Sequence, residues 1–540
     1  MLNLKQSAIF WYRNLNIHAK LIFGLISFYG VGALILFGKS SAINVLYHAF
    51  RQSSFVNILL ITIFLLGLLY ILFWKMRVVS YLSAEPLVVI FIGAVAVRVI
   101  MPFFLLIFVD TDPFSFMLAS KHRYLWKIAL GVASGHYEFS TAITTYNVLT
   151  AIPVWVSMLF SSNVAVMLFS AQVFQGVIDS VGCLLVFNIL RLSHGRKISL
   201  AGAAIYALWV PSIFYAYHIL DEAYTPVFVL SIGYWISKYI KTQNMGSLIL
   251  AGLFSGIALS LRVDNFLILP FVAGYIIWLS REKIFSGLVK AGGLLLICAV
   301  SFVLINTGIK NSFTIKSTLY GTCDEVFSAC FFNALGEYPA TYKGMRFFDN
   351  ATASIYAREQ LAKYSENSSS GPSFIAKTVH HFAPEFSVYI QEVILNRPFL
   401  YADWIVRRLI AYLPAHPNFA VVTYFLSSPK KNDKWTMVNY RFSQVFHSFK
   451  YFDYLMFGLA VYGVWLCRRN ESMMALALIY IGILVGHVFT QCGEAYFRNE
   501  IEEVYLNPKY LLGMATIFPL FLPLALQRLF GVEAVPAARA

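Results

Sequence analysis

The chain has 540 residues, of which 59% are hydrophobic and only 12% are charged, and its mean hydropathy is +0.69. No soluble core needs so large an apolar share, so the composition excludes an ordinary water-soluble protein and indicates a membrane protein. The formal net charge is +15. Because many basic residues flank apolar runs, membrane topology explains part of this charge, and no nucleic-acid partner is expected.

Long apolar runs recur along the chain. A helix that crosses a bilayer needs about 20 mostly apolar residues, and about twelve runs approach this length. The predicted fold class is therefore an all-α polytopic membrane protein with about twelve transmembrane helices. The expected spans are 19–37, 55–74, 86–109, 164–190, 199–217, 223–240, 247–262, 264–280, 289–308, 451–467, 472–490 and 509–527.

Basic residues fall on one side of the membrane when these spans alternate in direction. Cytoplasmic loops carry an excess of Lys and Arg, so this side is expected to face the cytoplasm. No small-residue cleavage site follows the first apolar run, which is interpreted as an anchor. The residues that define the side are Lys5, Arg13, Lys20, Lys75, Arg77, Arg191, Arg196, Lys197, Lys238, Lys241, Arg281, Lys283, Lys290, Arg468, Arg469 and Arg528.

Charged residues also gather at the outward ends of three spans. Asp110 and Asp112 directly follow the run 86–109. Two close acids repel each other and a helix C-terminus disfavours negative charge, so we expect one of the two pKa values to be raised toward the range of a general base. The alternatives are an acidic helix exit with an Asx turn and outward acids placed by topology alone. We expect this turn to meet two others in one outer cavity: Asp221 with Glu222, and Arg262 with Asp264.

Two charged residues lie inside predicted spans, where charge is costly and therefore indicates function or pairing. Arg98 lies within 86–109 and Asp179 within 164–190, and we predict that they pair across neighbouring helices. In the alternative, Arg98 extends into a wet cavity and Asp179 finds a hydroxyl group or water.

A metal site is a further hypothesis. His218 and Glu222 are separated by four residues, so one helix face would present both side chains to a divalent cation. A histidine at a helix end that only hydrogen-bonds its surroundings is the alternative.

The longest polar stretch, 309–450, is expected outside the membrane. Within it, 398–410 mixes apolar and basic residues and is typical of an amphipathic helix on the membrane surface; the region 121–160 is expected to be interfacial as well. Cys323 and Cys330 are candidates for a disulfide bond in an oxidising compartment, with Cys492 as a competing partner.

From Arg98 to about Pro270 the order of these features resembles the GT-C superfamily of glycosyltransferases, which use polyprenyl-phosphate-linked sugars. The resemblance is to the bacterial branch that contains the lipid A aminoarabinose transferases and relatives of the protein O-mannosyltransferases. Three residues depart from the family pattern: Asn147 begins the segment where the family has Pro-Pro, Ala223 stands in place of Pro, and Lys509 in place of Arg. The matching segments are Arg98, Asp112 with Ala119, Gly135-His136, Tyr146 to Pro153, Arg191 to Lys197, Asp221 to Ala223, Leu261 to Asp264, and Asn507 to Tyr510.

The resemblance implies a domain organisation and a reaction. It implies an N-terminal transmembrane hairpin (1–85), a GT-C-like catalytic core (86–308), an α-rich or mixed periplasmic and juxtamembrane segment (309–450) and C-terminal transmembrane helices (451–540). A polyprenyl-phosphate-sugar donor would transfer its sugar to lipid A, a polysaccharide or a protein at the outer face of a bacterial cytoplasmic membrane. Membrane lipids would be further partners.

The resemblance also implies residue roles. Asp112 would act as the general base, with Asp110 tuning its pKa and Glu222 positioning the acceptor or holding the metal. Arg262 and Lys509 would stabilise the leaving phosphate. The remaining expected substrate-binding residues are Asp221, Asp264, Tyr510 and Arg98.

Two other classes of protein stay open. In a transporter or lipid flippase, Arg98 and Asp179 would line a translocation path. An O-antigen ligase or polymerase would also act outside the membrane on polyprenyl-linked sugars. The concentration of charge at one membrane face argues against a transporter, and the early acid after Arg98 favours GT-C over a ligase.

Overall fold

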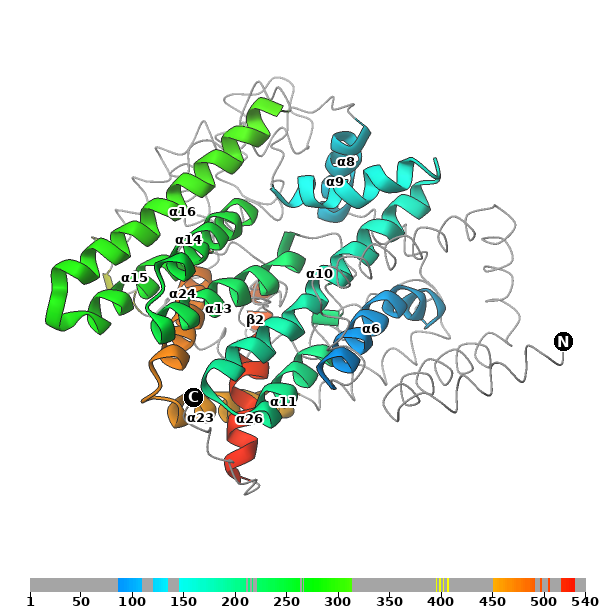
Figure 1. Ribbon diagram of the computed structural model, residues 1–540. Helices are drawn as coiled ribbons and strands as arrows, with labels where there is room; N and C mark the ends of the chain where they lie inside the picture. Colours follow the sequence, from blue (N-terminus) through cyan, green and yellow to red (C-terminus); the bar gives the residue numbers. More distant parts are fainter. Residues whose placement is uncertain are drawn as a thin grey trace, which may run out of the picture.

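The computed structural model describes residues 86–108, 120–134, 145–209, 212–213, 216, 221–262, 265, 267–312, 450–490, 496–497, 504–505 and 516–529, with a few single positions between 395 and 406. This part of the chain is helical apart from one short antiparallel pair of strands (Figure 1). In that pair, β1 (Tyr496–Phe497) lies against β2 (Val504–Tyr505). The helical fold class is therefore confirmed for the described residues, while the total number of spans stays a prediction.

The helices follow the predicted apolar runs closely. The expected spans 19–37 and 55–74 lie outside the described residues, as does most of the helix expected over 398–410. The helical elements are α6 (Pro86–Phe108), α8 (Ser120–Ser134), α9 (Thr145–Met158), α10 (Val164–Ser193), α11 (Arg196–Ala207), η1 (Asp221–Tyr224), α13 (Thr225–Thr242), α14 (Met245–Leu261), α15 (Ile268–Leu279), η3 (Arg281–Lys283), α16 (Ile284–Ser312), α23 (Lys450–Leu466), α24 (Glu471–Thr490) and α26 (Ile517–Leu529).

One predicted span was too long. The helix expected over 199–217 is α11, which already ends at Ala207. Leu208 leaves the helical conformation, with φ −96° and ψ 6°, and Pro211 follows within four residues. A proline cannot continue a helix and is common just after its end. The early end leaves the last carbonyl groups of α11 without helical partners.

Helix α10 lies at the centre of the fold and packs against α6, α9, α11 and α13 (Figure 1). A second group of helices surrounds α13: α14 packs between α13 and α16, and α24 packs against both α13 and α15. The C-terminal helix α26 closes the core by packing on α11 and α23. The C-terminal helices thus share one hydrophobic core with the central ones.

The tight α13–α14 turn shows how local sequence sets this packing. Gln243 ends α13 in the left-handed conformation, with φ 52°, and its backbone N–H donates to the carbonyl of Tyr239. The side chain of Asn244 then caps α14 by accepting a hydrogen bond of 2.8 Å from the backbone N–H of Gly246. Such capping favours a helix start directly after the turn, so α14 begins at once and packs against α13.

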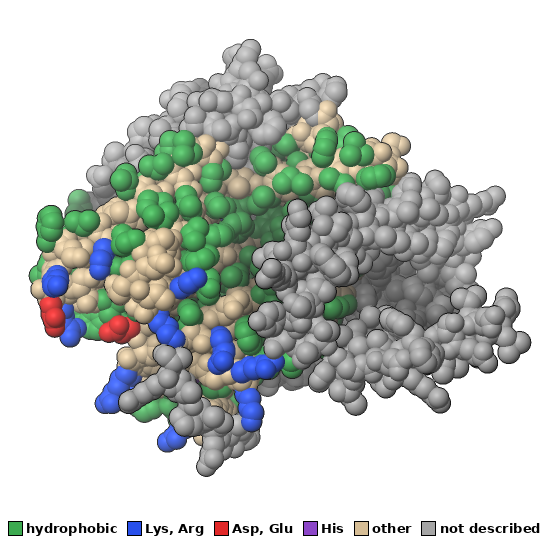
Figure 2. All heavy atoms as spheres, in the orientation of Figure 1, with side chains coloured by type: hydrophobic (Ala, Val, Ile, Leu, Met, Phe, Trp, Pro, Cys, Tyr) green, Lys and Arg blue, Asp and Glu red, His purple; other side chains and the backbone are tan. Residues whose placement is uncertain are grey.

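The predicted cytoplasmic turns lie together at one end of the helix bundle, here called the basic end. Lys241 donates a hydrogen bond of 2.6 Å to the carbonyl of Leu192, which joins the α13–α14 turn to the end of α10. Tyr275 donates one of 3.1 Å to the carbonyl of Glu471, which joins α15 to the start of α24. Figure 2 shows Lys and Arg side chains along the lower edge of this face, with hydrophobic side chains above them. This grouping is what the charge pattern predicts.

Two stretches in the described part of the chain are long and apolar enough to cross a membrane, Val166–Ser193 and Arg281–Asn306. They differ in burial: 61% of the most apolar part of the first is buried, but only 22% of the second. Helix α16 therefore presents an exposed apolar face. Its exposed side chains are Ile284, Phe285, Leu288, Val289, Leu295, Leu296, Val300, Val303 and Leu304.

Candidate functional site

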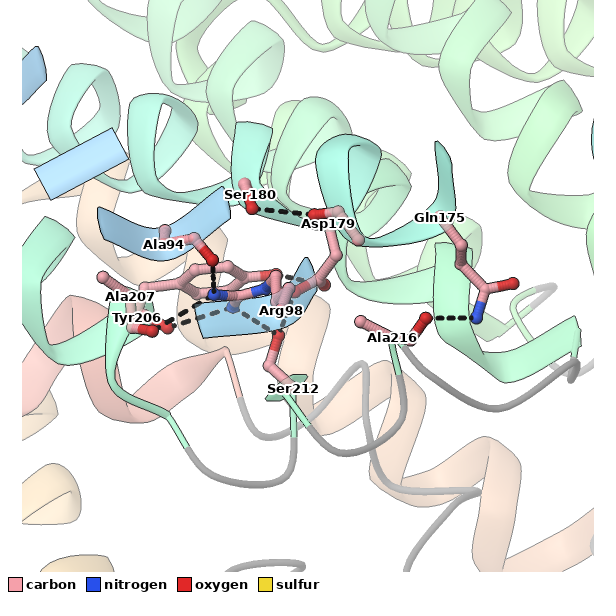
Figure 3. Close-up of polar contacts among 10 residues, drawn as sticks. Ala94, Arg98, Gln175, Asp179, Ser180, Tyr206, Ala207, Ser212 and Ala216 are labelled. Carbon is pink, nitrogen blue, oxygen red and sulfur yellow. Dashed lines mark hydrogen bonds and ion pairs between the residues drawn. The ribbon is translucent and has the colours of Figure 1, made fainter. Parts of the chain in front are cut away.

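Arg98 of α6 and Asp179 of α10 form a buried ion pair, with Nε of the arginine 2.5 Å from Oδ2 of the aspartate (Figure 3). Both residues are almost fully buried, at 2% and 1% exposure. The prediction that they pair across neighbouring helices is confirmed. The pair fixes the register of α6 against α10.

All five N–H groups of Arg98 are used within the protein. Besides the bond to Asp179, Nη1 donates to the carbonyls of Ala94 (3.2 Å) and Ala207 (3.1 Å). Nη2 donates to the carbonyl of Tyr206 (3.4 Å) and to Oγ of Ser212 (3.1 Å). The carbonyls of Tyr206 and Ala207 lie at the end of α11, and that of Tyr206 also accepts a hydrogen bond of 3.1 Å from the backbone N–H of Trp209. A cation at a helix C-terminus also interacts favourably with the helix dipole, so Arg98 caps α11.

The carboxylate of Asp179 is equally well bonded. It accepts hydrogen bonds from Oγ of Ser212 (2.5 Å) and from the hydroxyl of Tyr206 (2.9 Å). Tyr206 and Ser212 were not predicted as partners, because a hydroxyl in an apolar run is common and gives no signal of its own. We call these four residues, Arg98, Asp179, Tyr206 and Ser212, the core network. Full satisfaction is what makes a buried charge pair tolerable in an apolar interior.

The core network holds two segments that lead to predicted site residues. Helix α6 carries Arg98 and ends at Phe108, two residues before Asp110. Ser212 lies on the segment that leads to η1, and Gln175 of α10 holds the same segment by donating a bond of 3.0 Å to the carbonyl of Ala216 (Figure 3). Both segments are therefore anchored on α10 before they reach the acids.

The first turn of α9 joins the two other charged turns. Tyr146 is fully buried and its ring lies 5.5 Å from that of Tyr224, the last residue of η1. The preceding residue, Thr145, donates a hydrogen bond of 2.8 Å to Oγ of Ser260, two residues before Arg262. Consecutive residues of α9 thus contact the turn that carries Asp221 and Glu222 and the helix end that carries Arg262.

Arg262 itself caps the C-terminus of α14 in an extended conformation. Its backbone N–H donates to the carbonyl of Ala258, and Asn265 donates to the same carbonyl from its side chain at 3.0 Å. Arg262 is partly buried and makes a further contact. Arg262 and Asn265 therefore both bond to one carbonyl near the end of α14.

The remaining predicted site residues are not tested. Asp221 and Glu222 have a described backbone in η1 but no described side chains. The described part of the chain holds no group of three His, Cys, Asp or Glu side chains that fits a metal ion, and this leaves out His218, so the metal hypothesis stays a prediction. Also outside the described residues are Asp110, Asp112, Asp264, Lys509 and Tyr510.

Three cysteines and one histidine are further titratable residues in the described part of the chain. Cys183, Cys298 and Cys467 are buried and free, while Cys323, Cys330 and Cys492 lie outside the described ranges. At the basic end, Nε2 of His194 lies 3.9 Å from Sγ of Cys467. Burial lowers the pKa of His194 because removal from water disfavours the charged imidazole.

The sequence matches no family model and no curated protein. Two solved structures overlap with parts of the fold. One is the oligosaccharyltransferase AglB from Archaeoglobus fulgidus, in complex with an inhibitory peptide and a dolichol-phosphate, at 10% identity and a TM-score of 0.36 over 77% of this chain. The other is apo ArnT from Cupriavidus metallidurans, at 14% identity and a TM-score of 0.27, covering 73% of this chain and 72% of ArnT. The chain spans about half, 48%, of AglB, and at such low TM-scores the two overlaps assign neither the fold nor the function.

Proposed function

We propose that this protein is an integral membrane glycosyltransferase that moves a sugar from a polyprenyl-phosphate carrier to an acceptor. The observation that carries the proposal is the meeting of two charged turns on α9, through Tyr146 with Tyr224 and through Thr145 with Ser260. These contacts bring the neighbourhoods of Glu222 and Arg262 to one helix turn. A transferase needs such a grouping, because it must hold an acceptor and an anionic donor together.

The direction of the helices supports a site at the end opposite the basic end. Helix α10 reaches the basic end at Ser193, and α13 reaches it at Thr242, so Val164 and Thr225 lie at the other end. Helix α6 packs against α10, and the basic residues Lys75 and Arg77 that precede it predict that its N-terminus lies at the basic end. The C-terminus of α6, which leads to Asp112, therefore points to the same end as η1.

The proposed reaction follows from these positions. The acceptor hydroxyl or amine attacks the anomeric carbon of the sugar, the bond from that carbon to the phosphate oxygen breaks, and polyprenyl phosphate leaves. Asp112 takes the acceptor proton as general base, and the transition state resembles an oxocarbenium ion. Arg262 and Lys509 stabilise the negative charge that develops on the phosphate. Asp221 and Glu222 position the acceptor, and a divalent cation would add positive charge beside the phosphate.

The membrane location rests on the chain's own composition and on α16. The most apolar part of the 26-residue stretch Arg281–Asn306 has a mean hydropathy of 2.4, and only 22% of this part is buried. Water would strongly disfavour so large an exposed apolar face, whereas a bilayer matches it. By the positive-inside rule the basic end faces the cytoplasm, and the proposed site faces outward.

The core network argues against the transporter alternative. A residue that lines a translocation path must exchange partners with a substrate, yet Arg98 uses all five of its donors within the protein. We therefore propose that Arg98 positions the segments of the site and does not bind substrate. The acceptor class, whether lipid A, polysaccharide or protein, is best found by mass spectrometry of envelope lipids and glycans from a deletion strain.

The test of the proposal is the Asp112→Asn variant in a transfer assay with a radiolabelled polyprenyl-phosphate sugar. Loss of the general base is expected to slow transfer about 10²–10⁴-fold while expression and donor binding are unchanged. The matched control is Asp110→Asn, which keeps Asp112 and is expected to retain measurable transfer. Wild-type rates in Asp112→Asn would remove Asp112 from its role. Movement of the labelled lipid across proteoliposomes without any transfer would favour the flippase instead.

A further inference from the structure

A cavity of about 430 Å³ opens at the basic end, away from the proposed catalytic site. It lies between the end of α13, the turn from α15 to α16, and the start of α24. Its charged lining consists of Arg281, Lys283 and Lys290, together with Glu282 and Glu471. The cations outnumber the carboxylates, which gives the cavity a net positive charge.

The cations that line this cavity form no ion pair with the two carboxylates that line it. Among the described residues, the ion pair between Arg98 and Asp179 is the one found within 4.0 Å, so none of the three cavity cations is paired with a carboxylate there. The guanidinium of Arg281 lies over the ring of Trp278, 5.0 Å from its centre. Stacking of this kind holds the charge in place without cancelling it.

Lys290 is held in a similar way. Its Nζ donates a hydrogen bond of 3.4 Å to Oε1 of Gln243 and lies 5.9 Å from the centre of the Tyr239 ring. Lys283 follows Arg281 in the short helix η3 and is exposed. The turn and the first part of α16 therefore offer three positive groups to an anion in the cavity.

The cavity lies directly beside the exposed apolar face of α16. Phe285 is 80% exposed and follows Lys283 by two residues, and Leu288 is 51% exposed. Positive groups that border a long apolar face match the boundary between lipid headgroups and acyl chains. Figure 2 shows this change from charged to hydrophobic side chains at the lower left of the molecule.

We infer that this cavity binds the phosphate headgroup of an anionic membrane phospholipid, with the acyl chains along the exposed face of α16. Charge complementarity selects the headgroup, because anionic lipids of the cytoplasmic leaflet attract basic residues near the surface. The adjoining apolar face distinguishes a lipid from a free phosphate ion. The binding neither needs the transferase reaction nor follows from it.

The experiment compares lipid retention in two double variants of the full-length protein. Protein purified in detergent is mixed with phosphatidylglycerol or phosphatidylcholine, and bound lipid is counted by native mass spectrometry. Arg281→Gln with Lys290→Gln is expected to lower retention of phosphatidylglycerol about 10-fold or more, since each surface cation changes binding about 5-fold. The matched control, Arg196→Gln with Lys197→Gln, removes two exposed charges of the basic end outside the cavity and is expected to keep retention within about twofold of wild type.

Three results would overturn the inference. The first is equal loss of phosphatidylglycerol in both double variants, which would reflect only general surface charge. The second is equal retention of phosphatidylglycerol and phosphatidylcholine by the wild type. The third is full displacement of the lipid by inorganic phosphate at equal concentration, which would show that the cavity binds a soluble anion. Circular dichroism of each variant confirms that it remains folded.

Discussion

Replacing Asp179 with Asn tests the central feature of this fold. The substitution keeps the size of the side chain but removes the charge that pairs with Arg98. One of the two acceptor oxygens becomes an NH₂ group, so a donor from Ser212 or Tyr206 then faces another donor. Breaking a buried pair by removing one partner costs about 3–5 kcal/mol, because the other charge stays buried and unpaired.

The assay is equilibrium unfolding in mixed micelles, followed by tryptophan fluorescence. Ser180→Ala is the matched control: this buried hydroxyl, next to Asp179, donates a bond of 2.7 Å to the carbonyl of Gly176 in its own helix. Its loss is expected to cost about 1 kcal/mol. Arg98→Met combined with Asp179→Leu removes both charges and is expected to be more stable than Asp179→Asn alone. If Asp179→Asn unfolds at the same denaturant concentration as Ser180→Ala, the charge pair stabilises the fold no more than one buried hydrogen bond does.

Three further predictions concern packing, pH and positioning. A Cβ on Gly463 of α23 would collide with the backbone carbonyl of Phe521 in α26, whereas one on Gly458 of the same helix meets no atom within 4 Å. Gly463→Ala is therefore expected to lower the free energy of unfolding by about 1–3 kcal/mol. Gly458→Ala is the matched control and is expected to raise it by about 0.5–1 kcal/mol, because alanine favours a helix interior over glycine. The lowered pKa of His194 means that the folded state binds its proton less well than the unfolded state. Thermal stability is therefore expected to decline as the pH falls below 6.5, the ordinary pKa of histidine. Melting curves of His194→Gln should show a weaker decline over the same pH range. An equal decline in the variant would exclude His194 as its source. Gln175→Met removes the hydrogen bond to the carbonyl of Ala216 and so releases the segment before η1. The variant is expected to lower the rate of sugar transfer while changing the free energy of unfolding little. An unchanged transfer rate would contradict a positioning role for Gln175.

Much of the helical architecture follows from the apolar runs. Helix α10 begins at Val164, as predicted, and ends three residues beyond the expected Leu190. The pair of Arg98 and Asp179 was predictable because charges in apolar runs are rare and must find partners. The sequence does not show at which residue α11 ends, so the capping of this helix by Arg98 was not predicted.

The sequence predicted that the charged turns meet in one outer cavity, but it did not predict that two of them contact α9. Thr145 and Tyr146 lie 115 and 78 residues from their respective partners Ser260 and Tyr224, and spacing along a chain does not encode such long-range contacts. For Tyr146, its place in the resemblance segment from Tyr146 to Pro153 was the one available signal, and Thr145 lies just before this segment. The roles of Asp112 and Lys509 stay predictions, since both lie outside the described residues.

The complete bonding of Arg98 has a consequence for how the protein is made. An arginine at the middle of an isolated helix opposes insertion into the bilayer by about 2.5–3.5 kcal/mol. Its acceptors on α10, on α11 and at Ser212 emerge from the ribosome about 80–115 residues later, at about 5–20 residues per second. For several seconds the nascent α6 therefore lacks its partners, and its stable integration depends on helices that the ribosome has yet to synthesise.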